Sequence, residues 1–172
     1  MARFRIVPER SQVFIGARSS LHPINTRTDG LEGFLELTMG TDGAIDLSVS
    51  PNGRLSLPVE RLSSGNTLED REMRRRIDAR RYPMIHGDLV EIERAGDDGQ
   101  YRVRGDLMFK GVTKRYEDGM TITPLDDRTL RLEGESTFDV REFGMEPPRI
   151  LMLKVQPHVN VRVEIFAERE EA

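Results

Sequence analysis

Apolar and polar residues alternate along most of this chain, and this alternation predicts β-strands. The clearest case is the segment 101–110, YRVRGDLMFK, in which every second residue from Tyr101 to Phe109 is apolar or glycine. A period of two residues is typical of a strand with one buried face and one solvated face. Gly105 lies on the apolar face, where a side chain would normally pack. An interior glycine marks a bend, a bulge, or the close approach of a ligand or another backbone.

Three further stretches place a glycine on an apolar strand face. They are Leu31, Gly33, Leu35 and Leu37; Ile85, Gly87 and Leu89; and Leu130, Leu132, Gly134, Ser136 and Phe138. Inward glycines on several strands of one sheet predict a curved sheet around a space that side chains do not fill. We therefore expect a barrel that holds a ligand.

The same alternation predicts the order of the strands. They are expected at 4–17 with a break near Pro8, at 30–38, 45–49 and 55–59, and then at 84–93, 100–110, 112–123, 129–138 and 154–167. Most neighbours in this order are joined by short, turn-rich connections, which favour antiparallel pairing. The pattern indicates a mainly β fold, an antiparallel β-barrel that is closed or nearly closed.

One segment breaks the strand pattern. Residues 68–80 suit a short α-helix, with Met73 and Ile77 four residues apart on one face. Thr67 and Asp70 resemble a capping box at its start. Pro83 is expected to end the helical segment, because the residue before a proline is pushed towards extended geometry.

Composition narrows the class of protein. The chain has 172 residues, which fits a single domain over 1–172. It has no cysteine, no tryptophan and a net charge of −4, which disfavours a disulfide framework and a nucleic acid partner. No apolar run reaches the length of a signal peptide or of a membrane span. We therefore expect a cytoplasmic protein without integral membrane contact.

The histidines and the familiar catalytic motifs give little sign of chemistry. His22, His86 and His158 are far apart and lack the spacing of metal ligands, so neither a metal nor a cofactor is expected. His22 lies in a loop or strand end and is a candidate for polar recognition at a barrel mouth; the alternative is a hydrogen-bonded loop histidine. The sequence contains no GxSxG, Walker A, GxGxxG or HExxH motif, and we expect no enzyme and no catalytic residue.

A run of arginines in the predicted helix has two interpretations. Arg75 and Arg76 lie in its centre, and arginine clusters can bind phosphate groups through their fork of donors. Acidic residues such as Glu72 are interspersed with them. The alternative is a solvated helix whose surface ion pairs stabilise the fold by ~0–1 kcal/mol each.

Several short motifs together resemble one known family. They are Ser11-Gln12-Val13-Phe14, Gly33-Phe34, Ser63-Ser64-Gly65-Asn66 with Asp70 and Met73, Tyr82-Pro83, the nearly intact block from Tyr101 to Lys114, and Phe143-Gly144. With these motifs the chain resembles the YceI-like family of polyisoprenoid-binding, lipocalin-like barrels, from Phe4 to Ala167. Three features depart from the family pattern: Arg10 replaces a histidine, His86-Gly87 replaces an aromatic residue, and an arginine usual before the Phe-Gly element is displaced to Arg141.

The resemblance implies a lipocalin-like barrel with an elongated apolar cavity for an isoprenoid or another long-chain lipid, and a possible homodimer. The ligand-binding residues expected on these grounds are Phe14, Leu31, Gly33, Leu35, Met73, Ile77, Tyr82, Tyr101, Val103, Gly105, Leu107, Phe109, Phe143, Val161 and Val163. His22, Arg75 and Arg76 are the candidates for binding a polar head group. The leading hypothesis is a carrier or sequestering protein. The alternatives are an enzyme that uses the same cavity, with His22 or a buried carboxyl group as acid or base, and a solidly packed interaction module.

Overall fold

The computed structural model describes residues 1–147, 149–150 and 153–171. The long strands are β1 (Ala2–Ile6), β2 (Gln12–Arg18), β3 (Pro23–Thr28), β4 (Glu32–Leu37), β5 (Asn52–Pro58), β6 (Met84–Arg94), β7 (Gln100–Phe109), β8 (Val112–Pro124), β9 (Thr129–Asp139) and β12 (His158–Arg169). The short elements are η1 (Val59–Arg61), α1 (Thr67–Ile77), η2 (Val140–Phe143), β10 (Arg149–Ile150) and β11 (Leu153–Lys154).

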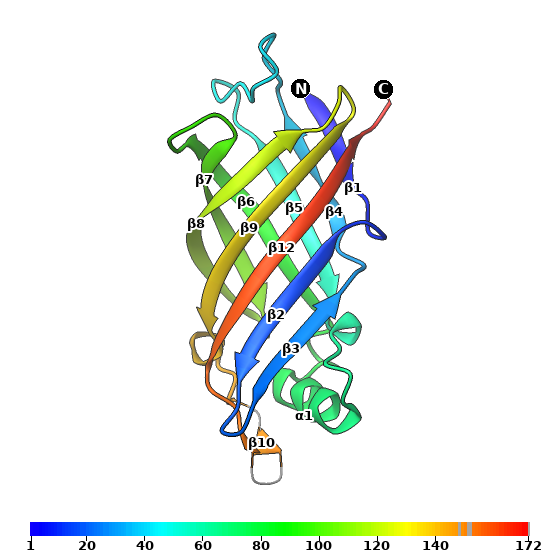
Figure 1. Cartoon of the computed structure of the whole chain (residues 1–172), viewed down its shortest axis with the longest axis vertical. Helices are drawn as coiled ribbons and strands as arrows, with labels where there is room; N and C mark the ends of the chain where they lie inside the picture. The colour runs from blue at the N-terminus through cyan, green and yellow to red at the C-terminus, as the bar shows by residue number, and fades with distance from the viewer. Residues whose placement is uncertain (148, 151–152, 172) are drawn as a thin grey trace.

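The strands form a closed antiparallel barrel, which confirms the predicted fold class. Eight of them follow the order β1-β4-β5-β6-β7-β8-β9-β12, and the circle closes because β12 also pairs with β1. Both termini lie at one end, which we call the upper end, and α1 lies with β10 at the opposite, lower end (Figure 1).

Strand β12 is long enough to pair with two partners along the same edge. Its C-terminal part pairs with β1, from Phe4 to Ile6, and its middle part pairs with β2. The strand expected over 4–17 is therefore two strands separated by a kink. Ser11 closes this kink, because its fully buried hydroxyl group accepts a hydrogen bond from the Phe166 amide at 3.1 Å. Strand β3, which the sequence pattern did not predict, extends the sheet beyond β2.

The upper end of the barrel is packed solid. Leu37, Ile45, Tyr101 and Leu130 are buried there and belong to one hydrophobic core. The strand expected at 45–49 was wrong, since this segment is a loop with a single bridge between Met39 and Ile45.

Two aspartates explain this loop. The Asp42 carboxylate accepts a hydrogen bond from the Ala44 amide, and the Asp46 carboxylate accepts one from the Ser48 amide, each at 3.0 Å. Such local side-chain bonds compete with a strand ladder for the same backbone groups.

Helix α1 forms where it was expected but has different ends. Its N-cap is Asn66 rather than Thr67, because the Asn66 side chain accepts hydrogen bonds from two amides of the first turn. The helix ends at Ile77, before the predicted boundary, because Asp78 adopts a left-handed conformation (φ 59°, ψ 58°). Asp70 does not complete a capping box; its carboxylate accepts hydrogen bonds from Ser64.

Candidate functional site: an apolar barrel cavity

The lower and middle parts of the barrel enclose a cavity of about 460 Å³. This volume lies within the roughly 300–1,000 Å³ of typical ligand sites. The walls are mostly aliphatic: Leu55, Leu89, Val103 and Val163 point inward from four different strands. Leu89, Val103 and Val163 face the interior and yet are only partly buried, because they border unfilled space rather than each other.

Most of the residues predicted from the sequence line this cavity. They are Leu31, Leu35, Met73, Ile77, Val103, Gly105, Leu107, Phe109, Val161 and Val163. They come from β7, β12, α1 and the region of β4, so the fold brings together segments that are far apart in the chain. The remaining predicted residues lie elsewhere, for reasons specific to each.

Phe14 and Gly33 are displaced by strand geometry. Val13 and Ile15 face the cavity, so Phe14 between them faces outward, with the Arg162 guanidinium 4.0 Å from its ring centre. Gly33 has a φ of 140°, and a Cβ atom there would overlap the carbonyl oxygen of Arg54. This glycine therefore permits close contact between β4 and β5 and contributes no cavity wall.

The other three predicted aromatic residues that do not line the cavity are found towards the two ends of the barrel. Tyr101 is buried in the packed core of the upper end. Phe143 is buried at the lower end, where its ring meets that of Phe109 edge-on at 5.6 Å. Tyr82 packs beside the β7–β8 turn, close to Gly111.

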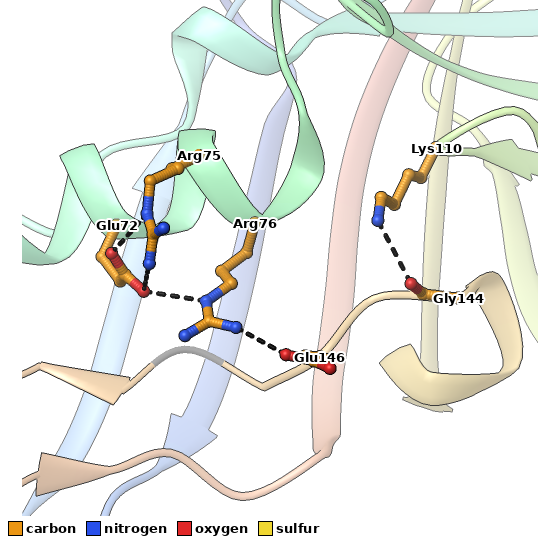
Figure 2. Close-up of polar contacts among 6 residues, drawn as sticks. All are labelled: Glu72, Arg75, Arg76, Lys110, Gly144 and Glu146. Carbon is orange, nitrogen blue, oxygen red and sulfur yellow. Dashed lines mark hydrogen bonds and ion pairs between the residues drawn. The ribbon is translucent and has the colours of Figure 1, made fainter.

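The predicted head-group residues do not line the cavity, and carboxylates already bind the two arginines. Figure 2 shows Arg75 and Arg76 both reaching Glu72, with Arg76 also reaching Glu146. The Arg76–Glu146 contact is 2.7 Å long and ties α1 to the chain that follows η2. Hydrogen bonds from Arg75 and then Arg76 lower the pKa of Glu72 to about 2. His22 is exposed in the β2–β3 turn, with its Nδ1 3.0 Å from the carbonyl oxygen of Pro23.

Helix α1 helps to close the lower end of the barrel. Met73 and Ile77 face the cavity from one side of the helix, and Glu69 and Asp70 border it near the helix start. Across from them, Lys110 in the β7–β8 turn donates a hydrogen bond of 3.1 Å to the carbonyl oxygen of Gly144 (Figure 2). This bond and the Arg76–Glu146 contact hold the η2 region and α1 around the lower end of the cavity.

Sequence reasoning missed two polar cavity residues on β8. The turn at Lys110-Gly111 has positive φ at both residues (53° and 73°), which is the geometry of a tight hairpin. Its register places Tyr116 opposite Gly105 and Asp118 opposite Val103, so both residues share the inner face. The alternation of β7, continued through this turn, would have indicated them.

Tyr116 joins an aromatic cluster at the side of the cavity. Its ring meets Phe138 edge-on, with the ring centres 4.6 Å apart, and its hydroxyl group donates a hydrogen bond of 2.9 Å to Glu142. Burial, and then the bond to Glu142, raise the pKa of Tyr116 well above its ordinary value. Tyr116 is therefore a neutral, fixed wall residue at physiological pH.

Three of the inward glycines differ in the space around them. A Cβ atom at Gly87 would have only the Leu55 Cβ near it, at 4.0 Å, so this position opens onto the cavity. A Cβ atom at Gly105 would be 3.1 Å from the carbonyl oxygen of Asp88, opposite an irregularity in β6. A Cβ atom at Gly134 would meet the flexible end of Met120 at 3.1 Å. Gly105 thus lines the cavity and also lies close to the backbone of β6.

A closed antiparallel barrel around an apolar interior cavity defines the class of lipocalin-like barrels. Within this class the chain belongs to the family of the YceI-like domain, whose model matches residues 4–167. No curated protein sequence matches the chain.

Solved structures confirm the fold at low sequence identity. Burkholderia cenocepacia BcnA has a TM-score of 0.77 at 14% identity, over 94% of this chain and 98% of BcnA. A polyisoprenoid binding domain from Saccharophagus degradans, implicated in plant cell wall breakdown, has a TM-score of 0.77 at 13% identity, over 99% of this chain and 100% of that domain. The Campylobacter jejuni YceI protein has a TM-score of 0.62 at 13% identity, over 81% of this chain and 82% of that protein.

Two features are absent from the part of the chain that the structure describes. Within 1–147, 149–150 and 153–171, no group of three His, Cys, Asp or Glu side chains is placed to hold a metal ion. None of the helices in the same part of the chain has the length and apolarity needed to span a bilayer.

Proposed function

We propose that this protein binds the apolar chain of an isoprenoid or a similar long-chain lipid in its barrel cavity, and carries or sequesters it without chemical change. The observation that supports this most directly is the cavity itself, about 460 Å³ of space with mostly aliphatic walls inside a closed barrel. Family membership adds support, because a structural relative from Saccharophagus degradans is a polyisoprenoid binding domain.

The energetics of such binding follow from the walls. Moving a methylene group from water into an apolar site gains ~0.8 kcal/mol, so a chain that buries about ten of them gains roughly 8 kcal/mol. Part of this gain is offset by the lost freedom of the two molecules. Binding through the chain therefore needs few polar contacts, and we propose that Val103, Leu107, Phe109, Val161 and Val163 make most of the apolar ones.

The two rival hypotheses fare differently. A solidly packed interaction module does not accord with a cavity of about 460 Å³. No arrangement of side chains in the described residues favours an enzyme over a binding protein. A single domain over 1–172, a cytoplasmic location and a homodimer remain predictions from the sequence.

Native mass spectrometry, followed by removal of bound lipid, tests the proposal. We expect the purified protein to carry a lipid-sized adduct that solvent extraction removes, and the delipidated, refolded protein to bind geranylgeraniol with one-to-one stoichiometry. Circular dichroism verifies that the refolded barrel is intact. If an intact barrel fails to bind geranylgeraniol, long-chain alkanes and an environment-sensitive apolar dye alike, the proposal is wrong.

A further inference from the structure

An acidic residue on the inner face of β8 interrupts the apolar wall of the cavity. Asp118 lines the cavity from the inner face of β8, opposite Val103, and is only partly buried. Among the described residues its carboxyl group has no hydrogen-bond donor and no cationic partner. Asp88 and Asp106, on neighbouring strands, are different because their carboxylates pair with Arg54 and Arg115 on the outer face.

Asp118 lies where the ladder between β8 and β9 stops. These strands pair only from Met120, opposite Gly134, to Pro124, opposite Leu130. Below this point, within the part of the chain that the structure describes, β8 pairs with β7 alone, while β9 continues to pair with β12. We call the unpaired stretch, residues 112–119 of β8 facing 135–139 of β9, the seam.

Ser136 lies across the seam from Asp118. Continuing the β8–β9 register below Met120 places Asp118 opposite Ser136 and Tyr116 opposite Phe138. The ring contact between Tyr116 and Phe138, at 4.6 Å, agrees with this continuation. Ser136 also lines the cavity and has no hydrogen-bond partner among the described residues. The Asp118 carboxyl group and the Ser136 hydroxyl group thus face the same apolar space, and neither has a hydrogen-bond partner among the described residues.

The cavity has no cation to bind a negative head group. Among the described lining residues only Arg54 is basic, and its guanidinium pairs with Asp88 on the outer face, at 2.6 Å and 3.0 Å. Lys114 shares the inner face of β8 but is exposed and does not line the cavity. The other charged side chains that border the cavity near α1, Glu69 and Asp70, are acidic. A phosphate or carboxylate head would therefore be repelled and left without a partner.

We infer that the cavity selects amphiphiles whose head is an uncharged hydrogen-bond donor, a hydroxyl group, and that Asp118 and Ser136 bind this head at the seam. The inference rests on the proposed function, since it assumes that the apolar chain occupies the cavity. The ligand hydroxyl donates its hydrogen to the Asp118 carboxylate and accepts one from the Ser136 hydroxyl group. A cationic head would satisfy Asp118 as well, but its transfer from water into an apolar cavity carries a far larger desolvation cost.

Two ligands with the same tail and different heads test the inference. We expect delipidated protein to bind geranylgeraniol at least about tenfold more tightly than geranylgeranyl diphosphate, measured by displacement of an apolar fluorescent dye at neutral pH and fixed ionic strength. Asp118→Ala should weaken geranylgeraniol about tenfold, the size expected for a hydrogen bond to a charged group. Asp118→Lys should reverse the preference, so that the diphosphate binds more tightly than the alcohol.

Glu117→Lys is the matched control, because it makes the same charge change one residue away on the outer face, where Glu117 pairs with Arg104. It should leave the ratio of the two affinities unchanged, and thermal melting should show that all variants are folded. Equal binding of alcohol and diphosphate by the native protein, or an unchanged ratio in Asp118→Lys, would overturn the inference. So would binding of the dye without binding of geranylgeraniol. Failure of every apolar compound, the dye included, would instead overturn the proposed function.

Discussion

Filling the cavity from one strand should weaken lipid binding strongly while the barrel stays folded, and Gly87 is the best position for this test. Gly87 lies on β6 among lining residues, and its backbone needs no positive φ. A new Cβ atom there would touch only the Leu55 Cβ, at 4.0 Å. The side chain of a Gly87→Leu variant would therefore extend into the empty space and not into a neighbouring side chain.

The size of the effect follows from the volume that is lost. A leucine side chain adds four carbon atoms and so displaces about four methylene groups of a bound chain. At ~0.8 kcal/mol for each group this weakens binding by roughly 3 kcal/mol, about a hundredfold in affinity. The melting temperature should stay within a few degrees of the native value, because leucine fills a void and is not forced into a packed core.

Gly119→Leu is the matched control for this experiment. The backbone of Gly119 borders the cavity, but Gly119 lies on β8 opposite Arg102, so a side chain there points outward. Its Cβ atom would have the carbonyl oxygen of Tyr101 near it, at 4.0 Å. Binding of geranylgeraniol to both variants is measured by dye displacement, and stability by circular dichroism. Equal affinities for Gly87→Leu and Gly119→Leu would refute the reasoning, as would a Gly87→Leu protein that melts much earlier yet binds normally while folded.

Gly105 is a less clean test than the strand pattern suggested. It lines the cavity, as its place on the apolar face of β7 predicted. Its Cβ would also be 3.1 Å from the carbonyl oxygen of Asp88, a backbone atom that can move only with its strand. We therefore expect Gly105→Leu to lower both lipid affinity and stability. A cavity position and a close approach of the backbone can both account for this glycine.

Three further predictions concern stability and metal dependence. Hydrogen bonds in α1 lower the pKa of Glu72 from 4.5 to about 2, so they stabilise the native state above pH 4.5. This contribution is lost as the pH falls towards 2. The difference in unfolding free energy between the native protein and Glu72→Gln, measured by urea unfolding, should therefore become smaller over that range. Ser11→Ala leaves the Phe166 amide without its bond and should cost about 1–3 kcal/mol in urea unfolding, whereas the exposed Ser48→Ala should cost much less. EDTA should change neither the melting temperature nor geranylgeraniol affinity, and a stoichiometric metal in elemental analysis whose removal abolishes binding would contradict this.

A strict contrast between the two faces explains three of the strands that the sequence predicted well. β6, β7 and β9 begin and end within a residue or two of the predicted bounds, because each has aliphatic residues inside and charged residues outside. β3 was missed because its inner face contains Ile24, Thr26 and Thr28, of which only the first is strongly apolar. Threonine suits a strand but does not distinguish an inner face from an outer one.

The cavity residues divide in the same way. The aliphatic residues of β7 and β12 could be predicted, because alternation alone places them on the inner face. Alternation within β8 could not reveal Asp118. The inner face of this strand carries the polar Tyr116 before it, and Asp118 is itself charged. Only the pairing across the Lys110-Gly111 turn shows that it faces inward. Arg75 and Arg76 show the opposite error, because their charge attracted attention while Glu72 already binds both of them.

The division of β12 between two partners explains why the barrel is hollow at only one end. In the upper part β1 joins β12 to β4, and the closed circle is filled by residues such as Tyr101 and Leu130. In the lower part β2 and β3 take the place of β1, and among the described residues β3 pairs with no strand except β2. The lower wall therefore needs a further element to cover it, and α1 provides one through Met73 and Ile77. The kink after Ile6 thus marks where the barrel wall changes from β1, which completes the upper circle, to β2 and β3, beside which α1 helps to line the cavity.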